Sequence, residues 1–421
     1  MAPRVVFLGD DFTGASDTLA AFTRAGWSAR LFLDLPGAGE AAALDAVGIA
    51  SNLRGMSRAD IADEIARLAP GIKALGADLV HFKVCSTFDS SPAIGSIGEA
   101  LRGLEAVLDP VVTALIGGQP SLGRYCAFGT LFARASDGLV YRIDRHPVMR
   151  NHPVTPMGEA DLTRHLAAQG VEPLMRLNHP ELQQSDPDQL AARLRGRVLL
   201  DVMNQSDLSR IGEALHRVPG MRLLVGASCV AEALTLGAIA PAAAAPAAGP
   251  ASTGVFVFAG SRSSVTEAQV AAAQGLQRIC IREQDLASPG SLVARSAELL
   301  VDGVPVLMHL DPKADYALDA AGLATRCAGV VDRVLALCPV GWLGLAGGDS
   351  SSTICQTLGF TDLRFVDAMD PGVCLCQASH KSALRDGMRV MLKGGQMGRA
   401  DLLTRFCALA RMENPANPRI G

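Results

Sequence analysis

Aromatic residues and blocks of like charge are both scarce in this sequence of 421 residues. Phe, Trp and Tyr make up 4% of the chain, although hydrophobic residues reach 49%. A composition rich in alanine, glycine and valine suits α/β layers, because small side chains let helices lie close against a sheet. The formal net charge is −4, and no run of five or more Lys or Arg occurs. Binding to nucleic acid requires a basic patch, and this sequence shows none, so we expect no nucleic-acid partner. Binding to a membrane surface is equally disfavoured.

Long apolar segments are also missing. No stretch reaches the roughly 18 consecutive apolar residues that span a bilayer. The first residues, Met1 to Asp11, lead directly into a short apolar run and two acids, without the basic and apolar regions of a signal peptide. The sequence therefore predicts a cytoplasmic protein.

The cysteines lack the spacings of disulfide scaffolds and zinc sites. Ten are present without a C-x-x-C pair, and apart from Cys374 and Cys376 they stand singly in apolar segments. In a reducing compartment we interpret them as small core residues. A metal site built from Cys374, Cys376 and His380 is the alternative.

The length exceeds what one hydrophobic core supports, so two domains are expected. The clearest boundary is Ile239–Ser252, IAPAAAAPAAGPAS. Alternating alanine and proline can neither hold a helix nor pair in a sheet, which indicates an extended linker. We therefore predict domains over 1–238 and 253–421.

Apolar runs of strand length alternate with helical patterns in both halves. The main strands predicted in the first half are Arg4–Leu8, Ala29–Leu33, Val47–Ala50, Leu79–Val84, Arg197–Val202 and Arg222–Val225. Those predicted in the second half are Gly254–Ala259, Arg278–Ile281, Pro305–Leu310, Trp342–Ala346, Leu363–Val366 and Val390–Lys393. Helices such as Ala15–Ala25 and Ile94–Leu108 separate them. The pattern predicts an α/β fold in which each domain has a largely parallel sheet flanked by helices. Ligands then collect where loops leave the carboxyl ends of strands.

The first such loop, residues 9–14, reads GDDFTG. The carboxylates of Asp10 and Asp11 precede the predicted helix Ala15–Ala25, and Thr13 lies in the same loop. They could hold the hydroxyls of a polyol, or one could act as a general base. The simpler interpretation is that one of them caps the helix.

Two further loops add cations and hydroxyls. Residues 51–54, SNLR, end in Arg54, whose guanidinium could bind a carboxylate unless it is merely a solvated loop residue. Lys83 ends an apolar strand, where burial is costly without an anionic partner. The residues after it, Ser86, Thr87 and Asp89, make a sugar-acid pocket the favoured interpretation.

A segment rich in proline, histidine and arginine covers residues 144–157. Its prolines exclude regular structure. His146 and His152 are either functional or anchors of the loop.

Glycine-rich loops follow strands at three places in the second half. They begin at Gly260-Ser261, at Gly347-Gly348-Asp349-Ser350 and at Gly394-Gly395. Glycine lets backbone N–H groups approach phosphate oxygens, and a following helix N-terminus favours anions. Three such loops on one sheet indicate a nucleotide site. Neither G-x-x-x-x-G-K-S/T nor G-x-G-x-x-G occurs, which disfavours P-loop and dinucleotide folds.

Taken together and in order, these motifs resemble the four-carbon acid sugar kinase family over nearly the whole chain. Residues 9–15 are similar to its opening A-D-D-F-T-G-A, and residues 83–91, KVCSTFDSS, to the K-Y-C-S-T-F-D-S-T of its 3-oxo-tetronate kinase branch. The remaining matches are Gly260-Ser261 to G-S, residues 347–351 to G-G-E-T-S, residues 371–373 to P-G-V and residues 392–398 to L-K-S-G-N-F-G.

The resemblance implies a kinase with an N-terminal acid-sugar domain, a C-terminal ATP domain and an active site in the cleft between them. It implies transfer of the γ-phosphate of ATP, with Mg²⁺, to a terminal hydroxyl. Asp11 and Lys83 would be catalytic, and Asp10, Thr13, Arg54, Ser86, Thr87 and Asp89 would contact the acceptor. ATP would bind Ser261, Gly347, Gly348, Asp349, Ser350, Gly394 and Gly395. The Mg²⁺ ligands stay unassigned, and a homodimer is expected as the assembly.

The acceptor depends on the details of the resemblance. The loop at residues 86–90 favours a 3-oxo-tetronate over plain threonate or erythronate. The family's S-R is here SNLR, and the segment 146–157 is longer than the H-P-L of the tetronate enzymes, which points to a differently shaped pocket and an acid such as 3-oxo-isoapionate.

Two other classes of function were weighed. A two-lobed protein that binds a small acid or a nucleotide without catalysis would have similar domains, but it needs no series of Gly/Ser loops at helix starts. An oxidoreductase would need a dinucleotide fingerprint, and none is present.

Overall fold

The computed structural model describes residues 2–135, 137–152, 154–236, 250 and 252–413, with Asp349 described by its backbone only. The chain divides into two compact units, 1–243 and 244–421. Most of the predicted linker, Ile239–Ser252, lies outside the described residues. Among the helices of the described ranges, none is long and apolar enough to cross a membrane.

The first unit contains a parallel sheet. Its strands are β1 (Val5–Gly9), β2 (Ala29–Phe32), β3 (Ala46–Ala50), β4 (Leu79–Lys83), β5 (Val112–Gly117), β9 (Met175–Leu177), β10 (Gly196–Asp201) and β11 (Arg222–Gly226). They are ordered β2-β3-β1-β4-β11-β5-β10-β9, and each neighbouring pair is parallel. The predicted architecture of this half is confirmed.

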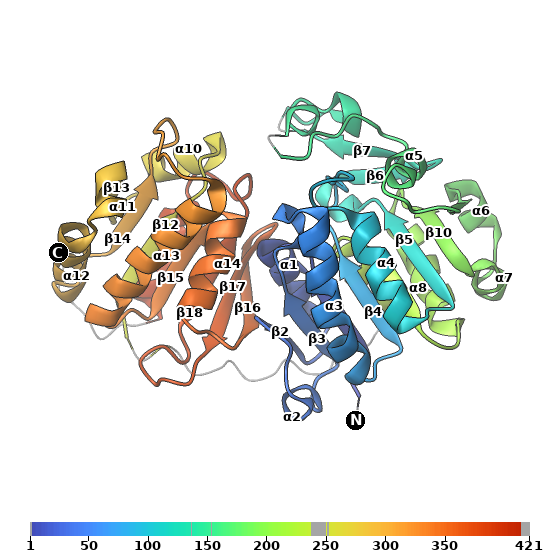
Figure 1. The fold of residues 1–421 in the computed structure, drawn as a ribbon, viewed down its shortest axis with the longest axis horizontal. Coiled ribbons are helices and arrows are strands. Elements are labelled where there is room, and N and C mark those ends of the chain that lie inside the picture. The colour runs from blue at the N-terminus through green and yellow to red at the C-terminus, as the bar shows by residue number, and fades with distance from the viewer. Residues whose placement is uncertain (1, 136, 153, 237–249, 251, 414–421) are drawn as a thin grey trace. The chain divides into compact units, whose positions relative to one another are not determined.

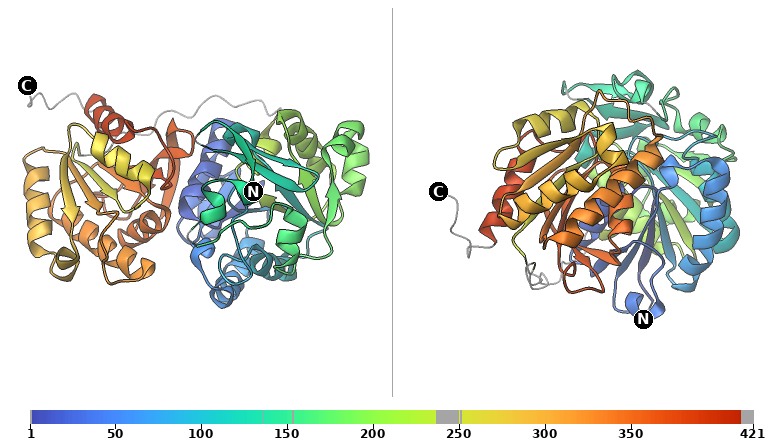
Figure 2. Two further views of the ribbon diagram at one scale, coloured as in Figure 1. Left: turned by 90° about the horizontal axis from the view of Figure 1, so that it is seen from above. Right: turned by 60° about the vertical axis from the view of Figure 1, so that its left-hand side comes forward.

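Helices flank this sheet on both sides (Figures 1 and 2). They are α1 (Phe12–Arg24), α2 (Ala38–Ala41), α3 (Arg58–Ala74), α4 (Ile97–Leu108), α5 (Leu162–Ala167), α6 (His179–Gln184), α7 (Pro187–Arg193), α8 (Gln205–Arg217) and α9 (Cys229–Thr235). Successive side chains of a strand face opposite ways. In β1, Val6 and Leu8 join the core under α3 and α4, whereas Phe7 meets Phe22 of α1 at 5.8 Å between ring centroids.

A separate antiparallel sheet, β6-β7-β8, was not predicted from the sequence. Its strands are β6 (Arg124–Ala127), β7 (Thr130–Arg134) and β8 (Val140–Arg142). The strands are short and follow one another without intervening helices, so the alternation of strands and helices gave no sign of them. Figure 1 shows this sheet apart from the parallel one.

The second unit has a mostly parallel sheet. Its strands are β12 (Val255–Ala259), β13 (Gln277–Ile281), β14 (Val306–Leu310), β15 (Trp342–Ala346), β16 (Asp362–Asp370), β17 (Val373–Ser379) and β18 (Arg389–Lys393). They are ordered β13-β14-β12-β15-β18-β17-β16. Its helices are α10 (Ser264–Ala272), α11 (Glu283–Ala287), α12 (Gly290–Val301), α13 (Ala320–Leu337), α14 (Gly348–Thr357) and α15 (Leu402–Met412). Figure 2 shows α10 and α15 on one side of the sheet and α13 and α14 on the other.

One strand departs from the parallel expectation. β17 is antiparallel to both β16 and β18, and the turn that joins it to β16 has Gly372 at φ +70°. A turn this short joins only antiparallel strands, since a parallel connection needs a crossover of a dozen or more residues. Cys374 and Cys376 lie on β17 and are buried in the core.

Candidate active site

Three predicted loops of the first unit meet at one sheet edge. β1 pairs with β3 and with β4, in a register that sets Gly9 opposite both Ala50 and Lys83. Asp10 and Asp11 follow β1, the turn that carries Arg54 follows β3, and Lys83 ends β4. The structure therefore brings together the charged groups that the sequence placed at three separate points.

These four charges form a compact cluster. Arg54 donates through Nε and Nη2 to the two carboxylate oxygens of Asp10, at 3.0 and 2.7 Å. Its Nη2 also donates to Oδ1 of Asp11 at 2.8 Å, and Lys83 Nζ donates to the same oxygen at 2.9 Å. Lys83 Nζ lies 3.5 Å from Asp10. Both cations are thus already paired with protein carboxylates, although the sequence suggested that Arg54 binds the substrate carboxylate.

Gly14 makes this arrangement possible. A Cβ atom at this position would overlap Lys83 Nζ and Asp11 Oδ1. Only glycine leaves room for the ammonium group to lie over the first turn of α1.

The cluster holds Asp11 and Lys83 in their charged forms. Burial alone would raise the pKa of Asp11, but Arg54 and Lys83 outweigh it and hold that pKa far below its usual value. Burial alone would lower the pKa of Lys83, but Asp11 and Asp10 raise it above its usual value. Asp11 is therefore an ionised hydrogen-bond acceptor near neutral pH, and Lys83 is a cation.

Asp11 is also the N-cap of α1, as the simpler interpretation held. Its Oδ1 accepts from the Gly14 N–H at 3.1 Å, and its Oδ2 accepts from the Thr13 hydroxyl at 2.8 Å. The cap and the Thr13 hydroxyl together fix the orientation of the carboxylate, because each holds one of its oxygens. In this structure, Thr13 therefore donates its hydroxyl hydrogen bond to Asp11.

The loop after β4 is tied internally. Thr87 donates its hydroxyl proton to Asp89 at 2.5 Å and lies 2.9 Å from the sulfur of Cys85. Phe88 between them has φ +53°, a backbone conformation that non-glycine residues rarely adopt. The hydroxyl proton of Thr87 is therefore already donated within the protein. Ser86, at the start of the same loop, is half-buried.

The two histidines of residues 144–157 anchor their own loop. His146 Nδ1 accepts from the N–H groups of Val148 and Met149, both at 3.2 Å. His152 Nδ1 accepts from the N–H of Thr155 at 3.1 Å. The segment folds as two 3₁₀ turns, Ile143–Arg145 and Met149–Asn151. These hydrogen bonds agree with the interpretation that His146 and His152 anchor the loop.

In the second unit, the three glycine-rich loops also leave neighbouring strands. β12, β15 and β18 are adjacent and parallel. Gly260 N–H and Ser261 N–H donate to the Ala346 carbonyl at 3.0 and 2.9 Å, and Gly347 N–H donates to the Lys393 carbonyl at 3.0 Å. These bonds link the starts of all three loops.

Close contacts explain why these positions carry glycine. A Cβ atom at Gly395 would lie 2.5 Å from Ser261 Oγ, and one at Gly260 would overlap Ser350 Oγ. Gly347 has φ +125°, which only glycine adopts readily. The backbone at this edge is accessible because side chains are excluded from it.

Helix α14 begins within the second loop. Gly347 is its N-cap residue, and no side chain caps it. The first N–H groups of a helix without a side-chain cap suit a phosphate. Gly348 and Ser350 lie in this first turn, and the side chain of Asp349 is outside the described part of the chain.

Lys393 is a residue that sequence reasoning did not assign to the site. Its side chain ends β18, is fully buried and donates to Thr266 Oγ1 at 2.8 Å and to the Gly395 carbonyl at 3.4 Å. Burial lowers its pKa to about 8. A lysine in an apolar strand before two glycines was the available signal.

The proposed metal site at Cys374 and Cys376 finds no support. Within the described ranges, no group of three or more His, Cys, Asp or Glu side chains could hold a metal ion. Burial raises the pKa of the Cys376 thiol well above its usual value, which disfavours the thiolate that a metal requires.

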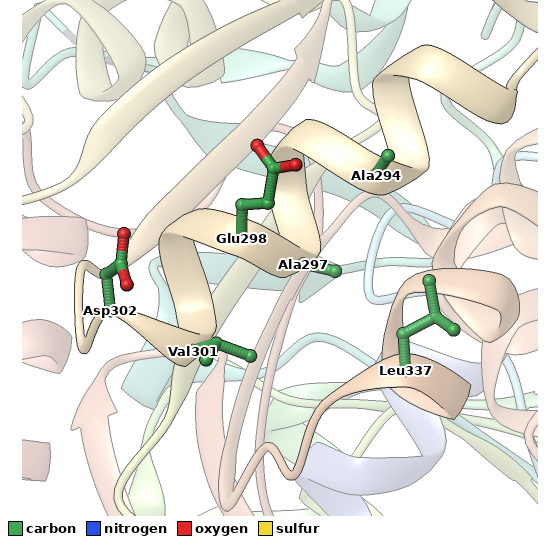
Figure 3. Close-up of a pocket in the computed structure, with 6 residues that line it drawn as sticks. All are labelled: Ala294, Ala297, Glu298, Val301, Asp302 and Leu337. Atoms are coloured by element: carbon green, nitrogen blue, oxygen red, sulfur yellow. The ribbon is translucent and has the colours of Figure 1, made fainter.

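A surface hollow between α12 and α13 lies away from these loops. Figure 3 shows Ala297 and Val301 pointing from α12 toward Leu337. The lining also includes Glu298 and Asp302 and no cation. Two carboxylates disfavour a phosphate or a carboxylate ligand, so this hollow is not a nucleotide or sugar-acid site.

Both units match established protein families. A model described as a sugar-binding N-terminal domain matches residues 5–234, and one described as a nucleotide-binding C-terminal domain matches residues 256–403.

Curated relatives match over almost the full chain. The 3-oxo-isoapionate kinase of Paraburkholderia graminis is 35% identical over 94% of this chain and 92% of its own length. The 3-oxo-tetronate kinase of Pseudomonas savastanoi pv. phaseolicola is 30% identical over 96% of both chains. The D-threonate kinase of Bordetella bronchiseptica is 27% identical over 97% of this chain and 98% of its own. These relatives are kinases, which favours catalysis over the alternative of binding alone.

Solved structures share the fold. A protein from Salmonella typhimurium LT2 is similar with a TM-score of 0.78 at 24% identity, covering 95% of this chain and 98% of that one. A protein from Haemophilus influenzae has a TM-score of 0.72 at 21% identity, covering 96% and 99%. With two matched domains, kinase relatives and this fold, the chain belongs to the four-carbon acid sugar kinase family.

Proposed function

We propose that this sugar-acid kinase transfers the γ-phosphate of ATP to a terminal hydroxyl of a small oxo-sugar acid. 3-Oxo-isoapionate is the first acceptor to test and 3-oxo-tetronate the second, with threonate and erythronate as poorer acceptors. The observation that carries this order is the 35% identity to a 3-oxo-isoapionate kinase, against 30% to a 3-oxo-tetronate kinase over a similar length.

The charge cluster supplies what the acceptor needs. Asp11 would accept the hydrogen bond of the attacking hydroxyl, since its carboxylate is ionised and fixed by capping. Lys83 would keep that carboxylate charged and offset negative charge as the phosphoryl group arrives. Phosphoryl transfer needs mainly positioning and charge stabilisation, so a rigid carboxylate beside a cation suits it.

The glycine loops supply what ATP needs. Backbone N–H groups around Ser261, Gly347, Gly348, Gly394 and Gly395 would bind phosphate oxygens, and the start of α14 would favour their charge. Lys393 would hold the third loop in place through its hydrogen bond to the Gly395 carbonyl.

Mg²⁺ is proposed to arrive with the nucleotide. It commonly keeps several waters and binds through substrate phosphates with one or two carboxylates, so it needs no cage of protein ligands. This fits the described residues, which hold no group of three or more such ligands. When bound, Mg²⁺ would neutralise charge on the β- and γ-phosphates.

Location and assembly are further proposals. A cytoplasmic location would supply ATP and keep the ten cysteines reduced, as they are in the structure. A homodimer is proposed as the assembly, and sedimentation velocity would test it.

An ADP-release assay tests the acceptor. Steady-state kcat/KM is measured for 3-oxo-isoapionate, 3-oxo-tetronate, threonate and erythronate at saturating ATP. We expect the oxo acids to exceed the plain acids by about 100-fold or more, because a site built to hydrogen-bond a substrate group rejects analogues without it. A hundredfold preference for threonate or erythronate would contradict the oxo-acid assignment and leave the kinase intact.

A further inference from the structure

Arg124 lies at the same sheet edge as the charge cluster. It begins β6, just after the carboxyl end of β5, and β5 is separated from β4 only by β11, with all three strands parallel. The backbone groups of Arg124 and Gln119 bond to each other in both directions, at 2.9 and 3.0 Å. The two residues form an antiparallel bridge.

The guanidinium of Arg124 has unused donors. Its Nε is buried without a hydrogen-bond partner, and its Nη1 donates to the carbonyl of Leu122. Within the described residues, Arg124 forms no ion pair with a carboxylate. Arg54 and Lys83, by contrast, are both bound to Asp10 and Asp11.

A second unused atom belongs to its partner in the bridge. Gln119 Nε2 donates to Ser228 Oγ at 2.6 Å and to Glu232 Oε1 at 3.0 Å, while Gln119 Oε1 is buried without a partner. Directly opposed residues of an antiparallel pair project to the same side. A buried donor and a buried acceptor are therefore both unsatisfied on one side of this turn.

The electrostatics place Arg124 near the loop after β4. Burial lowers the pKa of Arg124, and the neighbouring Cys85 partly offsets this effect. Cys85 follows Lys83 by two residues. A guanidinium whose Nε is buried without a hydrogen-bond partner is costly, and an anion that accepts from it removes that cost.

The charge balance of the site requires a further cation for an acidic substrate. Asp10 and Asp11 offset Arg54 and Lys83, and Asp89 adds a carboxylate in the adjoining loop. A sugar acid brings another negative charge, which this cluster does not attract.

We propose that Arg124 binds the carboxylate of the acceptor and that Gln119 Oε1 accepts a hydrogen bond from the hydroxyl on the adjacent carbon. This assignment rests on the proposed function, since it deepens the acceptor site. The chemistry selects 2-hydroxy acids, in which a carboxylate and a hydroxyl are neighbours. Neither residue was indicated by the sequence motifs, because the bridge that pairs them forms only in the folded chain.

The test compares charged and neutral acceptors. Wild type, Arg124→Gln and Arg124→Lys are assayed with the best acid and with the ketose in which a hydroxymethyl group replaces its carboxylate. For Arg124→Gln, we expect kcat/KM for the acid to fall by about 100-fold or more, and that for the ketose by less than about threefold. The kcat/KM of Arg124→Lys for the acid should lie between those of wild type and Arg124→Gln, because lysine keeps the charge and loses the planar guanidinium. The KM for ATP should not change.

Arg134→Gln is the matched control. Arg134 lies on β7 of the same small sheet, and its exposed guanidinium contacts the hydroxyl of Tyr125. We expect it to leave both acceptors unaffected. Gln119→Leu should lower kcat/KM for the 2-hydroxy acid more than for its 2-deoxy analogue.

Equal losses for acid and ketose in Arg124→Gln would mean a structural role and overturn the proposal, as would unchanged kinetics. If wild type phosphorylated no acid, the proposed function would fail, and calorimetric titration with the same acids would decide on Arg124. Binding by wild type that Arg124→Gln loses would support the carboxylate site, whereas equal binding, or none to wild type, would overturn it.

Discussion

Asp11 has two roles at the residue scale that the sequence presented as alternatives. It caps α1 through Oδ1, which accepts from the Gly14 N–H, and it carries the charge that Arg54 and Lys83 share. A substitution that keeps the cap and removes the charge separates the two roles. Asparagine does so, because it caps helices about as well as aspartate.

We therefore expect Asp11→Asn to lower kcat by roughly 10²–10⁴-fold with little change in the free energy of unfolding from capping itself. Asp186→Asn, at the exposed cap of α7, is the control and should keep full activity. Turnover near that of wild type in Asp11→Asn would remove Asp11 from the mechanism and make Asp89 the next candidate.

Lys393 offers a test by pH. Its pKa in the folded protein is lowered to about 8, against about 10.4 in an unfolded chain. Between these values the unfolded state binds more protons, so stability rises with pH in this window, and below pH 8 the contribution is constant and unfavourable. Relative to Lys393→Met, wild type should gain on the order of 3 kcal/mol in the free energy of unfolding between pH 7.5 and 10.5.

Urea unfolding measures this difference, followed by the fluorescence of Trp342 in a Trp27→Phe background, so that the second unit alone is reported. Lys313→Met, at an exposed position, is the control and should run parallel to wild type. Parallel curves for Lys393→Met as well would show that the buried lysine titrates normally.

The sequence predicted the positions of the charged residues but not their pairing. Asp11 and Arg54 each follow an apolar strand and Lys83 ends one, and the carboxyl ends of parallel strands share an edge. That Arg54 bonds to Asp10, which lies 44 positions away, depends on strand order, which propensity does not encode. Arg124 was not predicted as a site residue for the same reason.

At the scale of elements, the three glycine-rich loops contact one another, so the residues of one loop restrict the side chains that fit in the next. Gly395 lies against Ser261, and its carbonyl accepts from Ser263 Oγ at 2.5 Å and from Thr266 Oγ1 at 3.0 Å. Because a trans peptide points its N–H opposite to its carbonyl, the N–H that follows Gly395 is directed away from these hydroxyls. The carbonyl is held on one side so that a donor is presented on the other.

Gly395→Ala should therefore raise the KM for ATP by roughly tenfold or more, because the added methyl displaces Ser261 and blocks approach to the backbone. The KM of the acceptor should stay within about twofold. Gly290→Ala at the start of α12, where an added Cβ atom meets no other atom within 4 Å, is the matched control. If the two KM values in Gly395→Ala moved together or not at all, the nucleotide would bind elsewhere.

The elements were predictable where strands and helices alternate. β1, β4, β12 and β15 were predicted within a residue or two, since each is a mainly apolar run of strand length. β5, β9, β17 and the small sheet β6-β7-β8 were not predicted. For β17 a signal existed in Pro371-Gly372, because this pair marks a tight turn.

At the scale of the whole molecule, the chain consists of two units, and each has a hydrophobic core of its own. Each also has a tryptophan: Trp27 stacks on Phe22 in the first unit, and Trp342 packs against Phe406 in the second. The assignment of the sugar acid to 1–238 and of ATP to 253–421 can therefore be tested in the intact chain.

We expect ATP with Mg²⁺ to stabilise the second unit first. A ligand at about 100 times its Kd adds about 2.7 kcal/mol to the stability of the state that binds it. In Trp27→Phe, where Trp342 reports, ATP should shift the urea midpoint upward, and the sugar acid should shift it little. In Trp342→Phe, where Trp27 reports, the acid should give the larger shift. NAD, the control nucleotide, should shift neither transition. An ATP effect seen only through Trp27 would reverse the assignment, since a ligand stabilises most directly the unit whose folded state holds its site.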